Sequence, residues 1–168
     1  YKTKFSNSII RSDFISKLTK SAKGSRIIAT TGFTSRELFQ IRKDNKSNNF
    51  KDFYMVGAMG HASMVALGYS LISKEKIICL DGDGAFLMHQ GASTISAKFA
   101  NKNFKYILLN NNSHDSVGGQ NTYANNIDFE RLSKSLGFKK FYKIKNNKNL
   151  KQNIKKFLKG NSLNFLEV

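Results

Sequence analysis

The sequence predicts an α/β fold, a doubly wound parallel sheet with helices on both of its faces. Strand-like and helix-like segments alternate along the chain, and the strand-like segments are apolar at nearly every position. Such strands are typical of a parallel sheet that is buried on both sides. A length of 168 residues fits one domain, so we assign residues 1–168 to a single domain.

Each expected strand is a short run of mainly apolar residues, bounded by polar or glycine-containing turns. In chain order, the expected strands are 26–30, 53–56, 76–80, 105–110, 140–144 and 163–168. Between the strands lie segments whose apolar residues recur at the three- and four-residue spacing of a helix. The expected helices are 8–21, 36–42, 57–73, 85–100, 128–137 and 149–160.

Glycines and polar residues mark the limits of several elements. Gly137 and Gly160 stand where helix C-caps are expected. A polar loop over 43–52 separates the second helix from the second strand. Cys79, the single cysteine, lies in an expected core strand, so the chain has no disulfide framework and we expect a reducing compartment.

A formal net charge of +17 would suit a nucleic-acid-binding protein. However, only five of the 28 basic residues are arginines, and the lysines are scattered through the chain. We therefore interpret them as a solvated surface and expect no nucleic-acid partner. The positive field would favour a small anionic substrate.

Apolar runs in the sequence are too short for a membrane span. None approaches the roughly 20 residues that cross a bilayer, and no signal peptide is visible. We therefore expect a cytoplasmic protein without a membrane partner. The chain begins with Tyr1 and stops at Val168 in an apolar run, and we interpret it as a fragment or subunit of a larger enzyme.

Segments rich in Gly, Thr, Asn and Asp follow four of the expected strands. They are TTGFTS at 30–35, GAMGH at 57–61, DGDG at 81–84 and NNNSHDS at 110–116. In doubly wound sheets, ligands bind at the carboxyl ends of the strands. The sequence therefore predicts a binding site that is built from these segments.

The DGDG segment has the residues for an anion and a metal ion. Its glycines let the backbone approach a ligand closely, and backbone N–H groups near Gly82 to Ala85 can point at an anion. Asp83 could hold a hard divalent cation beside that anion, and asparagine oxygens after the next strand are also suitable ligands.

Gly-Asp-Gly at 82–84, followed by 25 residues and then Asn-Asn at 110–111, resembles the signature of thiamine diphosphate enzymes. In that family the Asp, the second Asn and a backbone carbonyl two residues later bind Mg²⁺, which holds the cofactor's diphosphate. The resemblance implies that Asp83, Asn111 and Ser113 are the metal ligands.

The segment GAMG at 57–60 resembles the part of these enzymes that lies under the bent cofactor. The resemblance implies that Met59 supports the bend and that the Gly57 carbonyl accepts a hydrogen bond from the 4′-amino group. The other residues that we expect to contact the cofactor are Thr31, Gly60, Gly82, Gly84 and Ala85.

Four longer segments indicate a more specific family: TTGFTSREL, VGAMGHAS, CLDGDGAFLMH and LNNNSHDSVGGQ. Together they resemble the phosphonopyruvate decarboxylase family, and the related sulfopyruvate decarboxylase β subunits almost as closely. The similarity runs from about Thr30 to Gln120, in the carboxyl-terminal half of such an enzyme. The family usually has Pro after GGQ, whereas this chain has Asn121.

The resemblance implies thiamine diphosphate- and Mg²⁺-dependent decarboxylation of 3-phosphonopyruvate to phosphonoacetaldehyde and CO₂. Two alternatives stay open: a sulfopyruvate decarboxylase β subunit, and a non-catalytic module of the same fold. His114, Asp115 and His61 are the candidate catalytic residues. The first two follow a metal ligand on a strand-end loop, where functional residues concentrate. Asp81 caps a turn or holds the loop instead.

These enzymes take the Glu that activates the aminopyrimidine from another domain. No such domain is recognisable in the 168 residues. We therefore expect a pyrimidine-binding domain in cis or in a partner subunit, and a homo-oligomer or hetero-oligomer that shields the shared cofactor from water.

Overall fold

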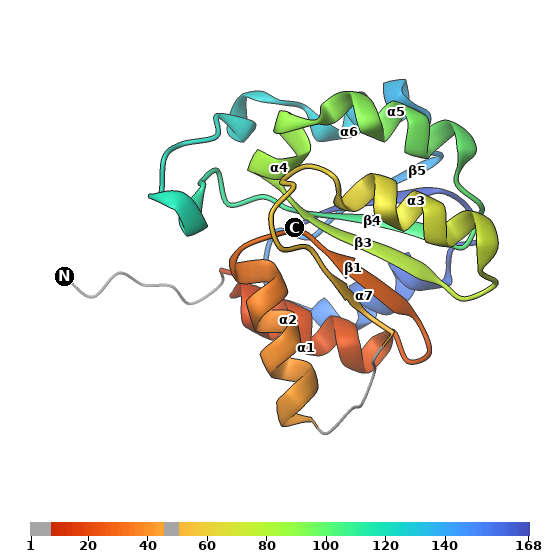
Figure 1. Ribbon diagram of the computed structural model, residues 1–168, viewed down its shortest axis with the longest axis horizontal. Coiled ribbons are helices and arrows are strands. Elements are labelled where there is room, and N and C mark those ends of the chain that lie inside the picture. Colours follow the sequence, from red (N-terminus) through yellow and green to blue (C-terminus); the bar gives the residue numbers. More distant parts are fainter. Residues whose placement is uncertain (1–7, 46–50) are drawn as a thin grey trace.

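The computed structural model describes residues 8–45 and 51–168, so part of the expected polar loop lies outside the described residues (Figure 1). Six parallel strands form one sheet in the order β2-β1-β3-β4-β6-β5. They are β1 (Arg26–Ala29), β2 (Phe53–Tyr54), β3 (Ile77–Gly82), β4 (Phe104–Leu109), β5 (Lys140–Lys143) and β6 (Asn164–Glu167). The predicted parallel sheet is thus confirmed.

Helices cover both faces of the sheet, as the doubly wound prediction requires (Figure 1). On one face lie α1 (Arg11–Ser21), α2 (Phe33–Asp44) and α7 (Leu150–Lys159). On the other lie α3 (Ala62–Ile72), α4 (Asp83–Met88), α5 (Gln90–Phe99) and α6 (Phe129–Leu136). Two short 3₁₀ helices, η1 (Asp115–Val117) and η2 (Ala124–Asn126), follow β4.

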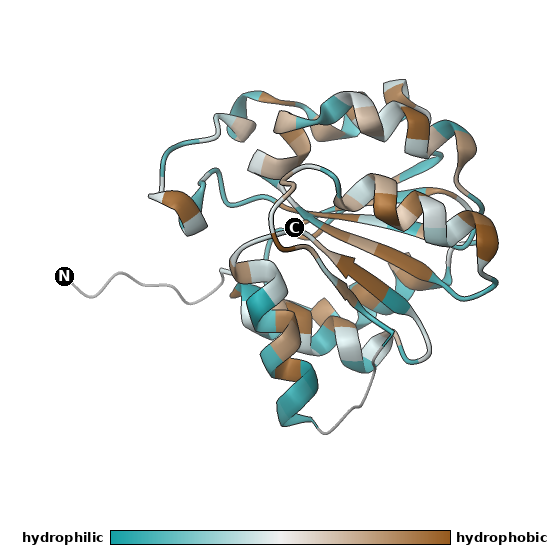
Figure 2. Cartoon of the chain, in the orientation of Figure 1, coloured by the Kyte–Doolittle hydropathy of each residue, from teal (hydrophilic) through white to brown (hydrophobic). Residues whose placement is uncertain are grey.

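Two hydrophobic cores lie between the sheet and these helix layers. Because successive side chains of a strand point to opposite faces, Ile78 and Leu80 of β3 enter one core, while Ile77 and Cys79 enter the other. Cys79 is fully buried, as predicted for a core residue. Figure 2 shows the apolar strands between the two layers.

Two expected helices differ from the observed ones because hydropathy does not report backbone dihedral angles. Residues 57–61 form a loop instead of the first turn of a helix, and Gly57, Ala58 and Gly60 have positive φ angles. The expected helix over 85–100 is interrupted at His89, whose φ of −136° and ψ of 40° are not helical. The result is two helices, α4 and α5, that meet at an angle.

Other helix boundaries differ from the expected ones for local reasons. Helix α2 begins at Phe33, earlier than expected, after Gly32 with a φ of 82°. Gly137 adopts the predicted left-handed cap of α6, with a φ of 111°. Gly160 also follows its helix, but with an extended backbone, φ −59° and ψ 128°. A side chain there would collide with Asn164 Nδ2, 2.4 Å from the position of a Cβ.

Among the described residues, no helix combines the length and the apolar character that crossing a bilayer demands.

Lys105 is a buried cation near the start of β4, at the amino-terminal ends of the strands. It is 1% exposed, and its Nζ donates to the carbonyls of Lys102, at 3.0 Å, and Ser162, at 2.6 Å. Burial, and to a lesser extent the charge of Lys76, lowers its pKa to about 8. The folded state therefore binds fewer protons than the unfolded state between pH 8 and the ordinary lysine pKa, and stability rises with pH across that interval.

We expect the substitution Lys105→Met to remove this pH dependence of the free energy of unfolding. Between pH 7 and 9.5, the free energy of unfolding of the wild type should rise relative to the variant by ~1–2 kcal/mol, because only the wild type relieves a buried charge. Urea denaturation at the two pH values measures the difference. Parallel pH profiles for the two proteins would contradict the assignment.

Candidate functional site

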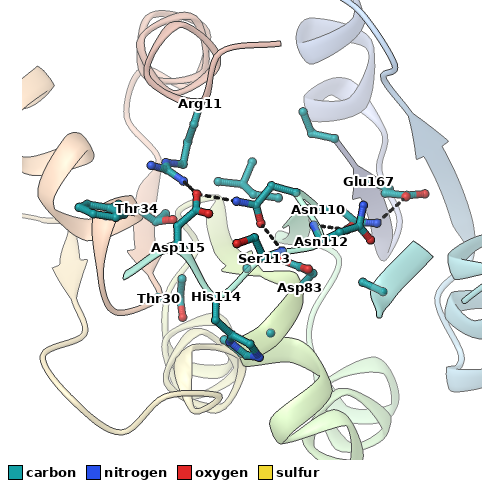
Figure 3. Close-up of a pocket in the computed structure, with 18 of the residues that line it drawn as sticks. Arg11, Thr30, Thr34, Asp83, Asn110, Asn112, Ser113, His114, Asp115 and Glu167 are labelled. Carbon is teal, nitrogen blue, oxygen red and sulfur yellow. Dashed lines mark hydrogen bonds and ion pairs between the residues drawn. The ribbon is translucent and has the colours of Figure 1, made fainter. Parts of the chain in front are cut away.

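A cavity of about 560 Å³ lies at the carboxyl ends of the strands, where the sequence predicted a site. Its walls come from the residues that follow β1, β3, β4 and β6 (Figure 3). All three expected metal ligands line it, as do the candidate catalytic residues His114 and Asp115. Of the expected cofactor-binding residues, the lining includes Thr31, Met59, Gly82, Gly84 and Ala85.

Asp83 is the buried carboxylate of this cavity. It is the first residue of α4, directly after β3, and only 1% of it is exposed. The hydroxyl of Thr122 donates a hydrogen bond to its Oδ2. Among the described residues, no cationic side chain forms an ion pair with Asp83. A buried carboxylate is costly unless it is compensated, so its surroundings fit a bound divalent cation.

The other expected ligands, Asn111 and Ser113, lie on the loop after β4. The described residues hold no cluster of three His, Cys, Asp or Glu that could bind a metal, so amide and carbonyl oxygens would complete the site. Asn111 accepts a hydrogen bond from the Ser113 N–H, at 3.2 Å, through its Oδ1. The side-chain oxygen of Asn112 is buried in the same wall and has no hydrogen-bond partner among the described residues.

This loop folds back on itself and so brings Thr122 to Asp83. An isolated antiparallel bridge joins Ser113 to Asn121, and the Thr122 N–H donates to the Asn112 carbonyl at 3.1 Å. Asn121, at the position where the family usually has Pro, also accepts a hydrogen bond from the Tyr123 N–H at 2.6 Å. Asn121 in place of Pro is therefore compatible with the folded-back conformation of this loop.

His114, which Figure 3 shows at the cavity, lies directly against Gly84. A Cβ added to Gly84 would come within 2.3 Å of His114 Cε1. A side chain at this position would therefore displace the imidazole, so the small size of glycine, and not its backbone dihedral angles, matters here. Gly84 thus leaves space for the His114 ring beside the Gly-Asp-Gly turn.

The segment 57–61 reaches the cavity only through Met59. Gly57, Gly60 and His61 do not line it in the described structure. Gly60 packs tightly against the end of α4, where a Cβ would meet His89 Cβ at 2.7 Å. The Nδ1 of His61 lies 3.2 Å from the carbonyls of Ala58 and Met59. Its ring packs against that of His89, with the centroids 4.4 Å apart.

Asp81 is equally buried, at 1% exposure, but it does not line the cavity. It accepts hydrogen bonds from the Tyr106 hydroxyl, at 2.6 Å, and from the Gly82 N–H, at 3.0 Å. Burial raises the pKa of Asp81, and these hydrogen bonds oppose the rise. Burial also raises the pKa of Tyr106 well above its usual value. Asp81 thus links the end of β3 to Tyr106 of β4.

Several lining residues were missed from the sequence. Glu167, at the end of β6, accepts hydrogen bonds from Asn110 Nδ2, at 3.0 Å, and from Lys143 Nζ, at 2.7 Å. Arg11 of α1 lines the opposite side. Thr122, which contacts Asp83 but does not line the cavity, was within reach of a sequence argument, since it lies on the loop that carries the expected ligands. Arg11 and Glu167 belong to no local motif, and nothing in the sequence marked them.

The comparison with known families shows to which family this chain belongs. The family model described as the thiamine pyrophosphate enzyme C-terminal TPP binding domain matches residues 30–168. The chain belongs to this family. Thiamine pyrophosphate (TPP) is thiamine diphosphate, so the resemblance seen in the Gly-Asp-Gly signature is confirmed. The doubly wound sheet of this TPP-binding domain and its strand-end cavity agree with that membership.

Relatives of this TPP-binding domain carry two kinds of name. The sulfopyruvate decarboxylase subunit beta of Methanothermobacter thermautotrophicus is 36% identical over 128 residues, which is 76% of this chain and 66% of that protein. The phosphonopyruvate decarboxylase of Streptomyces hygroscopicus is 38% identical over 113 residues, 67% of this chain and 27% of that protein. The sulfopyruvate decarboxylase of Methanosarcina acetivorans is 32% identical over 161 residues, 95% of this chain and 40% of that protein.

The chain therefore spans only part of the length of each of these relatives. Both names denote decarboxylases, and the two kinds of relative are similarly close to this chain.

Proposed function

We propose that this TPP-binding domain holds Mg²⁺ and the diphosphate of thiamine diphosphate in an enzyme that decarboxylates an anionic 2-oxo acid. The observation that carries the proposal is Asp83, a buried carboxylate without a cationic partner among the described residues, at the wall of a strand-end cavity. The family membership and the names of the relatives support the same reaction.

In this proposal, Asp83, the Asn111 side-chain oxygen and the Ser113 carbonyl hold the metal ion, and oxygen ligands of this kind suit Mg²⁺. Gly82, Gly84 and Ala85 let the backbone approach the diphosphate, since no large side chain intervenes at these positions. Thr31 and Met59 form the remaining wall against the cofactor. The geometry gives Gly57 and Gly60 the supporting task of shaping the loop that carries Met59.

Bound thiamine diphosphate would supply the electron sink that lets the substrate carboxylate leave as CO₂. The chain's own contribution is to fix the diphosphate, exclude water from the cavity and place a proton donor near it. His114 is the proposed donor, because its ring is held against Gly84 in the cavity wall. His61 lies outside the cavity lining and would act only in the assembled enzyme.

A companion pyrimidine-binding domain, in cis or on a partner subunit, would complete the enzyme. The relatives named subunit beta fit a multi-subunit arrangement. An apolar outer face is available for the companion domain. It consists of the exposed side chains of α3 and of the α4–α5 segment, namely Met64, Leu71, Ile72, Met88, Ile95 and Phe99. Only Asp83 and Lys98 carry charge in these three helices.

The proposed substrate is 3-phosphonopyruvate, with sulfopyruvate as the alternative that the names of the relatives favour equally. A phosphonate carries up to two negative charges and a sulfonate carries one. Because Lys145 lines the cavity beside the Lys143–Glu167 ion pair and the chain is strongly basic, the dianion should be attracted more strongly.

Assays of CO₂ release from the two substrates, with the full-length protein, its companion domain, Mg²⁺ and thiamine diphosphate, test this choice. We expect kcat/KM to be about tenfold higher for phosphonopyruvate, which corresponds to about 1.4 kcal/mol. A preference for sulfopyruvate would assign the enzyme to the sulfonate reaction. Cofactor binding without CO₂ release from either acid would identify a non-catalytic module.

A further inference from the structure

Arg11 connects the first helix of the domain to the loop that carries the expected metal ligands. It is the first residue of α1, and α1 lies before the residues that the family model matches. Its Nε and NH2 groups donate to the two carboxylate oxygens of Glu37 on α2, at 3.1 and 3.0 Å. Its NH1 group donates to Asp115 Oδ2 at 3.3 Å (Figure 3).

Asp115 in turn contacts the side chain of Asn111. The same Oδ2 accepts a hydrogen bond from Asn111 Nδ2 at 2.7 Å. A carboxylate only accepts hydrogen bonds, so the amide of Asn111 must turn its NH₂ group toward Asp115. Its oxygen is then turned away from Asp115, to the side where it accepts from the Ser113 N–H. The orientation of a ligand oxygen is thus set by a neighbouring carboxylate.

Arg11 is suited to anchoring Asp115 and poorly suited to binding a substrate anion. Its guanidinium already faces two carboxylates, one of them with two parallel hydrogen bonds, and it lies over the Phe33 ring, 5.4 Å from the centroid. Bidentate arginine–carboxylate pairs fix geometry as well as charge. Through Glu37 the anchor is tied to α2, which is a rigid element of the fold.

We propose that Arg11 and Asp115 are positioning residues for the metal site: Arg11 holds Asp115, and Asp115 orients the amide of Asn111 so that its oxygen faces the Mg²⁺. The inference rests on the proposed function. It replaces the direct catalytic role that the sequence suggested for Asp115 with orientation of a ligand. Groups that orient metal ligands typically contribute 10–100-fold to metal affinity.

The test is calorimetric titration of thiamine diphosphate into the full-length protein with its companion domain, at a series of Mg²⁺ concentrations. Asp115→Ala and Arg11→Ala should each raise the Mg²⁺ concentration for half-maximal binding by about tenfold or more. Their effects should not add, because Arg11 acts through Asp115. Asp115→Asn should retain most of the metal affinity, since its oxygen still accepts from Asn111 and Arg11.

Arg36→Ala is the matched control. Arg36 also lies over the Phe33 ring, at 5.5 Å, but it makes no ion pair with Asp115 among the described residues. Its replacement should leave the Mg²⁺ dependence unchanged. If Arg11→Ala disturbs the packing of α1, the variant Asp115→Ala still tests the role of Asp115, because it leaves the Arg11–Glu37 pair intact.

Two outcomes would overturn the inference. One is an unchanged Mg²⁺ requirement in Asp115→Ala. The other is loss of turnover in Asp115→Asn with full metal affinity, which would return Asp115 to proton transfer. Failure of the wild type to bind the cofactor with Mg²⁺ would instead refute the proposed function, so the two failures are distinguishable.

Discussion

Asp83→Ala is expected to abolish Mg²⁺-dependent binding of thiamine diphosphate in the assembled enzyme. The wild-type carboxylate is 1% exposed and has the Thr122 hydroxyl as its side-chain partner. A metal ion would compensate this buried charge, and without the carboxylate the metal would lose its only anionic protein ligand among those we propose. Calorimetry should detect no binding at cofactor concentrations that saturate the wild type. Asn111→Ala should be nearly as severe.

Thermal unfolding gives a second measurement of the same prediction. Ligands that bind only the folded state raise its stability by mass action, so Mg²⁺ and thiamine diphosphate together should raise the Tm of the wild type and leave that of Asp83→Ala unchanged. Asp81→Asn is the control. Asp81 is as buried as Asp83 but faces Tyr106 instead of the cavity, so the ligand-induced rise should persist. Unchanged cofactor affinity in Asp83→Ala would disprove the ligand assignment.

The second large effect concerns the domain by itself. The 168-residue chain alone should release CO₂ from phosphonopyruvate about 10²–10⁴-fold more slowly than the assembled enzyme, the contribution typical of a missing acid or base. Each acidic residue of the cavity lining already has another task. Asp83 is assigned to the metal, Asp115 is bound by Arg11 and Asn111, and Glu167 is bound by Lys143 and Asn110.

Adding the companion domain, in cis or in trans, should restore CO₂ release. Leu71→Glu or Ile95→Lys should prevent the restoration, because a buried unpaired charge on the apolar outer face would oppose docking. Lys151→Glu, on α7 at the opposite face of the sheet, is the matched control and should have no effect. Turnover by the isolated chain near that of the assembled enzyme would mean that an acid within this chain does the activating.

The architecture and the position of the site follow from local features of the sequence. Apolar runs such as 76–80 and 105–110 predict buried parallel strands, since alternation would be needed for a half-exposed sheet. The polar residues after them then have to meet at one edge, because parallel strands all end on the same side. This is why Asp83 and the asparagines after the next strand could be expected at one site, while the choice of Asn111 and Ser113 as ligands came from the family resemblance.

Backbone conformation was harder to predict, because helical spacing of apolar residues does not encode φ and ψ. The helix expected over 57–73 begins only at Ala62, since Gly57, Ala58 and Gly60 take positive φ angles. Met59 of this loop reaches the cavity, while His61 stands at the N-cap position of α3 outside it and makes no capping hydrogen bond with its side chain among the described residues.

Pairs that are distant along the chain were decided by the tertiary structure. Arg11 and Asp115 are 104 residues apart, Asn110 and Glu167 are 57 apart, and Asp83 and Thr122 are 39 apart. None of these pairs has a spacing that a helix or strand repeats, so no periodicity could reveal them. They meet because crossover connections and a folded-back loop bring separate elements to one edge of the sheet. The sequence by itself thus predicted the sheet and its binding edge, and the family resemblance added the expected ligands, whereas only the packing of α1 and the loop after β4 decided which side chains contact those residues.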